Sequence, residues 1–312
     1  MSIWVTGGAG FLGTNLCLAL LDAGHDVVAL DNLCTGSKEN VQMLEARRGF
    51  TFIHHDVTQS WPKARDVQIV FNLASPASPI HYTRLDVETM NTNALGIINA
   101  VAFCQQSGST LLQASTSEVY GDPLEHPQRE TYYGHVNPIG PRSCYDESKR
   151  FAESYLYTAG NRLDLDYRMA RIFNTYGPYM ALNDGRVVSN FILAALRNEP
   201  LDLYGGGGQT RSFCYVDDLI QGLLTLASEP KAKRQVVNLG NPAEITVKQL
   251  AEQVIHACGS SSEVRIKGIM PDDPKKRKPD IARAKSLLGW SPKIPLAQGI
   301  EKTVTYFRGR IA

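Results

Sequence analysis

The chain has 312 residues, enough for one large domain or two modest domains with separate hydrophobic cores. Hydrophobic residues make up 43% and charged residues 20%, and the net charge of +1 gives no reason to expect nucleic acid or an acidic membrane surface as a partner. No apolar run reaches the roughly 18 to 20 residues of a membrane-spanning helix, and no basic stretch precedes the first apolar residues. We therefore expect a soluble globular protein whose fold starts near residue 1.

Six cysteines are scattered along the chain and form no C-x-x-C pair. This usage favours reduced thiols in the cytoplasm, with neither a disulfide framework nor a metal site. Cys144 precedes a tyrosine of interest, but no recognisable motif pairs it with a histidine, so we expect it to pack rather than to act as a nucleophile. His54 and His55 lack a third ligand at metal spacing and are better explained as residues at a strand end.

A dinucleotide-binding motif opens the chain. A β-type run over 3–6 leads into Gly7-Gly-Ala-Gly-Phe-Leu-Gly13, and a helical apolar pattern follows. Such glycines permit a tight turn and close approach of the backbone to a pyrophosphate, which the helix N-terminus attracts. The next strand, over 27–30, ends at Asp31, which is placed to bind a ribose hydroxyl, and no arginine follows to receive a 2′-phosphate. The pattern favours NAD over NADP; a glycine-rich turn without a nucleotide is the alternative.

The following runs predict alternating strands and helices. The strands are expected over 52–57, 69–74, 110–114 and 166–172, and the helices over 87–107 and 148–160. Continuous apolar strands are typical of a parallel sheet with both faces covered, and its binding sites form at the carboxyl ends of the strands. Asp56 and Val57 are placed there to meet an adenine, and Asn174 follows the last of these strands.

Beyond residue 174 the alternation weakens, which indicates a smaller second domain. We expect a helix that opens within 183–190, a flexible loop over 203–211 that carries Arg211, a helix over 216–228, a strand over 236–239 and a capping box at Thr246 and Gln249. The glycines at 205–208 have a competing reading as a linker. We assign 1–173 with 213–258 to a Rossmann-like NAD-binding domain, and 174–212 with 259–312 to a smaller α/β substrate domain.

Two further patterns have both a functional and an ordinary explanation. Tyr145 and Lys149 are four residues apart, so on a helix they share a face, where an ammonium can lower the pKa of a phenol and prepare it as a general base. The same spacing occurs by chance on solvated helices. The charged, proline-bounded segment 271–280 is usually a solvated face or a targeting signal when it stands alone.

The glycine motif, Ser115-Thr-Ser-Glu118 and Tyr145-x-x-x-Lys149 together resemble the extended short-chain dehydrogenase/reductase family. The resemblance runs nearly end to end. Within that family the chain is most similar to the UDP-glucuronate decarboxylases. The segments that carry this similarity are 73–79, 114–122, 134–141, 183–191 and 277–280. Ser117 stands where similar 4,6-dehydratases carry an aspartate that protonates the leaving hydroxyl, and Glu118 stands where related 4-epimerases lack an acid.

The resemblance implies a doubly wound α/β fold, NAD as cofactor and UDP-glucuronate as substrate, which would be converted to UDP-xylose without net redox change. It also implies a homodimer through the helices over 87–107 and 148–160. A 4,6-dehydratase and a catalytically silent NAD-binding scaffold remain as alternatives.

Roles for individual residues follow from the same resemblance. Tyr145 would remove the O4 proton, with Thr116 hydrogen-bonded to O4 and Lys149 keeping the phenol acidic. Glu118 would position or relay the proton returned to C5, and Arg277 would orient the carboxylate or supply a proton. The implied cofactor-binding residues are Gly7, Gly10, Phe11, Leu12, Gly13, Asp31, Asn32, Thr35, Gly36, Asp56, Val57, Leu73, Ser75, Thr92, Ala114, Tyr145, Lys149, Thr175 and Arg186. The implied substrate-binding residues are Asn174, Val188, Tyr204, Gln209, Arg211 and Arg277.

Overall fold

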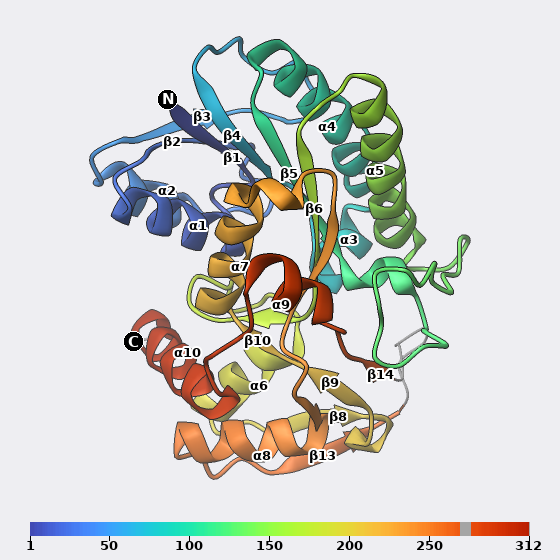
Figure 1. Ribbon diagram of the computed structural model, residues 1–312. Coiled ribbons are helices and arrows are strands. Elements are labelled where there is room, and N and C mark those ends of the chain that lie inside the picture. Colours follow the sequence, from blue (N-terminus) through green and yellow to red (C-terminus); the bar gives the residue numbers. More distant parts are fainter. Residues whose placement is uncertain (269–275, 312) are drawn as a thin grey trace.

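The computed structural model describes residues 1–268 and 276–311, and a seven-stranded sheet forms its larger region (Figure 1). The strand order is β11-β6-β5-β4-β1-β2-β3, and all neighbouring strands run parallel. The strands are β1 (Ser2–Thr6), β2 (Asp26–Asp31), β3 (Phe50–His54), β4 (Val67–Asn72), β5 (Thr110–Thr116), β6 (Tyr167–Ile172) and β11 (Val236–Leu239). The chain winds outward from β1 to β3 and then returns to continue from β4. The predicted doubly wound parallel sheet is therefore confirmed.

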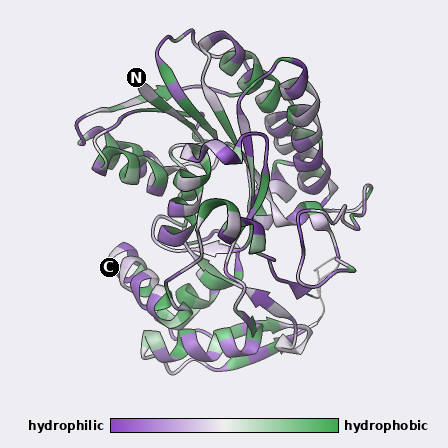
Figure 2. Ribbon diagram, viewed as in Figure 1, coloured by the Kyte–Doolittle hydropathy of each residue, from purple (hydrophilic) through white to green (hydrophobic). Residues whose placement is uncertain are grey.

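Helices cover both faces of this sheet. Ile3 and Val5 of β1 belong to one core with α1 (Phe11–Asp22) and α7 (Val216–Ser228), while Trp4 packs into the other core with α4 (Asp86–Ser107) and α5 (Ser143–Arg162). Successive strand residues point to opposite faces, so a sheet covered on both sides needs apolar residues at every position. The remaining helices of this region are α2 (Lys38–Glu45), α3 (Pro79–Arg84), α9 (Ala282–Leu288), η1 (Ser117–Tyr120) and η3 (Pro230–Ala232). Figure 2 shows helices with hydrophobic and hydrophilic sides.

Two predicted boundaries in this region need correction. The third strand ends at His54 rather than at 57, because the Asp56 carboxylate accepts the backbone N–H of Thr58 at 2.9 Å and forms a side-chain turn there. The helix expected from 148 begins at Ser143. Tyr145 and Lys149 therefore both lie on α5, one turn apart, as their spacing requires.

A smaller region lies across the carboxyl ends of the central strands (Figure 1). Its helices are α6 (Val187–Leu196), α8 (Val247–Cys258), α10 (Leu296–Ile311) and the short η2 (Gly205–Gly207), and its strands are β8 (Leu201–Tyr204), β9 (Thr210–Ser212), β12 (Glu244–Thr246), β13 (Val264–Lys267) and β14 (Lys276–Arg277). Two short strands, β7 (Thr175–Tyr176) and β10 (Cys214–Tyr215), pair with each other. α8, which we assigned to the first domain, packs against α6 and α10. The division into domains stays a prediction.

The segment 203–211 is not the flexible loop that its glycines suggest. β9 pairs antiparallel with β12 and parallel with β14, so Arg211 lies on the central strand of a three-stranded sheet. Both partner strands are distant in sequence, and local composition gives no sign of them. The capping box of α8 is confirmed, since Thr246 Oγ1 accepts the N–H of Gln249 at 3.1 Å and the Gln249 side chain accepts the N–H of Thr246 at 2.9 Å. Within the described ranges, no helix combines the length and the apolar character that crossing a bilayer requires.

Candidate active site

A cavity of about 1280 Å³ runs along the carboxyl ends of the parallel strands and continues against the smaller region. Its walls come from the glycine loop, the segment after β4, the end of β5, the start of α5 and parts of the smaller region. All the residues predicted for catalysis, cofactor and substrate line this cavity except Asp56. Asp56 lies just outside the lining and accepts hydrogen bonds from Asn32 at 3.2 Å and Thr58 at 2.9 Å, and its predicted contact with the adenine stays a prediction.

The glycine loop has no room for side chains. A Cβ added to Gly13 would lie 2.0 Å from the carbonyl oxygen of Gly7, and Gly7 itself has φ +68° with its added Cβ 2.9 Å from the Ala74 backbone. Both positions therefore require glycine, and the backbone at the start of α1 stays open to a phosphate.

Asp31 occupies the end of β2 next to this loop. Its carboxylate accepts the N–H of Ala9 at 3.0 Å and that of Leu33 at 2.8 Å, and burial raises its pKa against these two hydrogen bonds. Gly36 faces the same carboxylate, and an added Cβ would lie 3.0 Å from Asp31 Oδ1 and 2.8 Å from Ala9 Cβ. The Asp31 carboxylate is suited to the ribose hydroxyls of NAD, and the neighbouring glycine loop is suited to its pyrophosphate.

The predicted catalytic side chains meet at the end of β5. Tyr145 and Lys149 are both buried, and the Lys149 Nζ lies 5.8 Å from the centre of the Tyr145 ring and donates to the Ala114 carbonyl at 3.1 Å. Thr116, the last residue of β5, lies close enough to the Tyr145 side chain to lower the pKa of the phenol. The Tyr82 ring of α3 stacks on the Tyr145 ring at 5.1 Å with an interplanar angle of 11°. The helix and the stacked ring together fix the orientation of the phenol.

The electrostatics of this pair differ from the expectation. Burial raises the pKa of Tyr145 to about 12, and Thr116 and then Arg186, rather than Lys149, are the main groups that oppose the rise. Burial also lowers the pKa of the Lys149 ammonium to about 8, against the charge of Glu153. Desolvation thus outweighs the attraction that the four-residue spacing suggested. To act as a base near neutral pH, the phenol needs further positive charge beside it.

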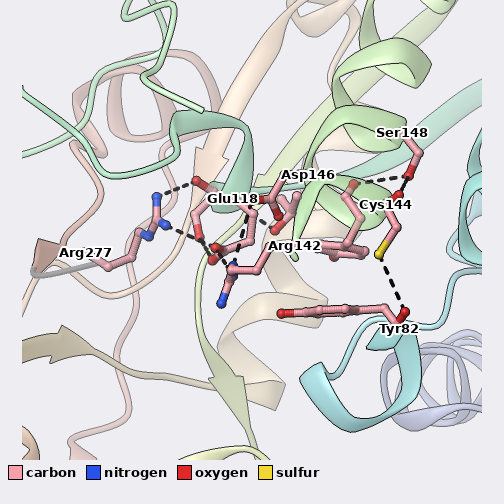
Figure 3. A network of polar contacts seen from close by, with 10 residues as sticks. Tyr82, Glu118, Arg142, Cys144, Asp146, Ser148 and Arg277 are labelled. Atoms are coloured by element: carbon pink, nitrogen blue, oxygen red, sulfur yellow. Dashed lines mark hydrogen bonds and ion pairs between the residues drawn. The ribbon is translucent and has the colours of Figure 1, made fainter. Parts of the chain in front are cut away.

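Glu118 pairs with two arginines, as Figure 3 shows. Arg142 donates to Glu118 Oε2, and Arg277 donates to the same oxygen at 3.1 Å while its other Nη donates to the Ser117 carbonyl at 2.7 Å. Burial opposes the charge of Glu118, but Arg277 and then Arg142 outweigh it and lower the pKa of the carboxyl. Glu118 is therefore held as a carboxylate and accepts hydrogen bonds.

Arg277 is not part of a solvated face. Its side chain is 2% exposed, because β14 pairs with β9 and places Arg277 opposite Arg211 in the small sheet. The prediction for a solvated face is wrong at this residue, and 271–275 lie outside the described residues. The functional explanation, in which Arg277 faces the sugar site, agrees with its place in the cavity wall.

The sequence-based prediction missed three residues of this site. Tyr82 stacks on Tyr145, Arg142 binds Glu118, and Asp146 lies with its Oδ2 3.8 Å from Arg142 Nε. Within the described residues, Asp146 Oδ1 is buried without a hydrogen-bond partner, and burial followed by the charge of Glu118 raises the pKa of Asp146 to about 7. One signal was present in the sequence, since Arg142 and Asp146 share the four-residue spacing of Tyr145 and Lys149.

Comparison with known proteins identifies the family of this chain. Residues 3–240 match the model of the NAD dependent epimerase/dehydratase family. UDP-glucuronic acid decarboxylase 1 of Xenopus tropicalis is 49% identical over 306 residues, which are 98% of this chain and 72% of that protein. UDP-glucuronic acid decarboxylase 3 of Arabidopsis thaliana is 47% identical over 312 residues, which are 100% of this chain and 90% of that protein.

Solved structures give the same family at lower identity. UDP-glucose 4-epimerase from Thermotoga maritima, solved with UDP-glucose, superposes with a TM-score of 0.89 at 29% identity and 100% coverage of both chains. UDP-glucuronic acid 4-epimerase from Bacillus cereus, solved with UDP-glucuronic acid and NAD, superposes with a TM-score of 0.88 at 26% identity, covering 99% of this chain and 100% of that one. The resemblance read from the motifs is therefore confirmed. The chain belongs to the NAD-dependent epimerase/dehydratase family, alongside the UDP-glucuronic acid decarboxylases.

Proposed function

We propose that the protein converts UDP-glucuronate to UDP-xylose and CO₂ with bound NAD. The observation that carries this function is the Glu118, Arg142 and Arg277 cluster beside Tyr145 and Thr116, on a chain 46–49% identical to UDP-glucuronic acid decarboxylases. The two 4-epimerase structures compared above are 29% and 26% identical to it.

Oxidation at C4 of the sugar makes loss of its carboxylate possible. NAD, when bound, supplies a positively charged ring that accepts a hydride from C4 and returns it in the last step. Tyr145 removes the proton of the C4 hydroxyl, and Thr116 hydrogen-bonds the same oxygen. With a ketone at C4, the C5 carboxylate belongs to a β-keto acid, so CO₂ leaves while the electron pair of the broken bond passes into an enolate. Tyr145 and Thr116 then stabilise the enolate oxygen.

The proton that returns to C5 reaches the carbon in the neighbourhood of Glu118. Because Arg277 and Arg142 keep Glu118 ionised, the carboxylate holds a water in place by accepting one of its hydrogen bonds, and the other proton of this water moves to C5. The hydroxide that is left takes a proton from bulk solvent, so the overall reaction consumes one proton. This role of Glu118 is positioning rather than direct donation. Tyr145 finally gives its proton back to O4 as the alcohol re-forms.

Two alternatives fit the site less well. A 4,6-dehydratase needs an acid for the leaving hydroxyl, whereas position 117 is a serine and the neighbouring Glu118 is held as a carboxylate. A silent NAD-binding scaffold has no use for a buried tyrosine, lysine and threonine at one strand end, yet Tyr145, Lys149 and Thr116 all lie there.

The test of this function is CO₂ release. The purified protein, supplied with UDP-glucuronate and NAD far below the substrate concentration, should release one CO₂ per sugar over many turnovers. Release that stops after one equivalent of NAD, or no release by a protein shown to bind NAD, would contradict the proposal.

We also propose that the protein is a cytoplasmic homodimer. Apolar side chains stand exposed on the adjacent helices α4 and α5, with Val87 at 61%, Met90 at 46%, Phe151 at 44% and Tyr157 at 63% exposure. A second copy of the same two helices would cover them. All six cysteines are unpaired thiols, which suits a reducing compartment. Light scattering should give twice the chain mass, and Phe151→Glu should shift it toward the monomer; a monomeric parent would contradict the dimer.

A further inference from the structure

Arg142 lies one helical turn before Tyr145 in the chain, and its side chain contacts Tyr82, the ring that stacks on Tyr145. It precedes α5 directly, and its carbonyl accepts the N–H groups of Tyr145 and Asp146 at 3.0 Å each, which fixes it one turn before the catalytic phenol. Its guanidinium carbon is 5.9 Å from the centre of the Tyr82 ring, which in turn stacks on Tyr145. In a uronate, C5 is bonded to C4 and carries the carboxylate. A guanidinium at this place is therefore positioned to meet that carboxylate when O4 contacts Tyr145.

The two arginines of the cluster differ in exposure and in the groups that they bind. Arg277 is 1% exposed and holds both the Ser117 carbonyl at 2.7 Å and Glu118 at 3.1 Å. Removing it from a main-chain carbonyl would leave a buried acceptor unsatisfied. The Arg142 side chain is 23% exposed, lines the cavity and donates to Glu118. A ligand carboxylate reaches Arg142 with less rearrangement than Arg277.

Replacing Glu118 by a ligand carboxylate on Arg142 costs little free energy, because Glu118 has a second arginine. When another carboxylate binds Arg142, Glu118 keeps Arg277, so each buried charge still has a partner. When CO₂ leaves, Arg142 can bind Glu118 again. Glu118 therefore competes with the sugar carboxylate for Arg142. This competition limits how strongly Arg142 stabilises the carboxylate before CO₂ is lost. Asp146, with Oδ2 3.8 Å from Arg142 Nε, helps to keep the guanidinium in place during the exchange.

We propose that Arg142 recognises the carboxylate of the sugar by exchanging it for Glu118, and that Arg142 thereby selects uronates over neutral sugar nucleotides. The inference rests on the proposed function and assigns the carboxylate to a residue of its site. A planar guanidinium binds a carboxylate through two parallel hydrogen bonds, which a neutral hydroxymethyl group does not offer.

Binding to a variant that does not turn over substrate tests this assignment. In NAD-saturated Tyr145→Phe protein, calorimetry should show tighter binding of UDP-glucuronate than of UDP-glucose. Adding Arg142→Gln should weaken UDP-glucuronate about 10- to 100-fold and leave UDP-glucose within about twofold, since one charge-assisted contact is lost. Adding Glu118→Gln should keep or tighten UDP-glucuronate binding, because the competing carboxylate is gone. Arg162→Gln, at the exposed end of the same helix, is the matched control and should change neither ligand.

The outcomes separate this inference from the proposed function. Equal weakening of both ligands by Arg142→Gln, or no weakening of either, would overturn the role of Arg142. A parent Tyr145→Phe protein that does not prefer UDP-glucuronate would overturn the proposed function instead. Arg142→Lys keeps the charge without the planar fork, so it should fold even if the glutamine variant does not. It should weaken the binding of UDP-glucuronate and leave that of UDP-glucose unchanged. Equal binding of UDP-glucuronate by Arg142→Lys and its parent would also contradict the assignment.

Discussion

The cofactor side and the sugar side of the cavity are held by different kinds of contact. On the cofactor side, backbone fills the space around Gly7 and Gly13, and Asp31 is fixed by two backbone N–H groups. On the sugar side, charged side chains hold one another, and Arg277 reaches Glu118 across 159 positions of sequence. A site held by backbone tolerates no added atoms, whereas a site held by ion pairs can exchange partners. This difference suits a cofactor that stays bound and a sugar that loses a charged group.

The largest expected effect lies where the two sides meet. Tyr145→Phe removes the phenol oxygen and keeps the ring on Tyr82, so the rate of CO₂ release should fall about 10²- to 10⁴-fold, as for loss of a general base. NAD binding and thermal stability should stay near those of the parent. Tyr133→Phe, at a tyrosine that is 90% exposed and lies outside both the cavity lining and the proposed dimer face, is the control and should keep full activity. A Tyr145→Phe protein with more than a tenth of the parent rate would contradict the role of the phenol.

A second change tests the rigidity of the cofactor side. Gly13→Ala places a methyl group 2.0 Å from the Gly7 carbonyl oxygen, and backbone cannot turn aside as a flexible side chain can. NAD affinity, measured by fluorescence titration, should fall about 100-fold or more, with a loss of stability of about 2 kcal/mol or more from overpacking. Gly309→Ala, in α10 with nothing within 4 Å of the added carbon, is the matched control and should be neutral or slightly stabilising. Equal losses of NAD affinity and stability in Gly13→Ala and Gly309→Ala would contradict the rigid, backbone-held character of the cofactor side.

The smallest expected effect tests the charges on the sugar side. The pKa of Asp146 is raised from 3.8 to about 7, chiefly by burial, so the folded state binds its proton more tightly than the unfolded chain. The stability this gives is complete below about pH 4 and is lost as pH rises through about 7. Relative to the parent, Asp146→Asn should therefore gain about 1–3 kcal/mol between pH 5 and pH 8. Urea unfolding at both values measures it, and a difference that does not change with pH would contradict a buried, protonated Asp146.

The same contrast explains what could be predicted from sequence. The glycine loop, Asp31 and the alternation of strands and helices are all local patterns. The predicted parallel sheet was confirmed, and the glycine loop and Asp31 lie at the ends of β1 and β2 as expected, while their contacts with NAD stay predictions. Arg211 was expected in a loop, and Arg277 on a solvated face under the ordinary reading. The place of Arg211 in a strand and the burial of Arg277 both depend on strand pairing between distant segments, which local composition does not show. The pKa of Tyr145 was misjudged since spacing on a helix carries no information about desolvation.

Product analysis in deuterated water tests the central claim most directly. If C4 is oxidised, CO₂ lost and a proton returned at C5, NMR should show UDP-xylose with one deuterium at C5, while C4 keeps the hydrogen that it carried in the substrate. A product that retains its carboxylate with inverted C4, or a product that has lost water rather than CO₂, would contradict the account.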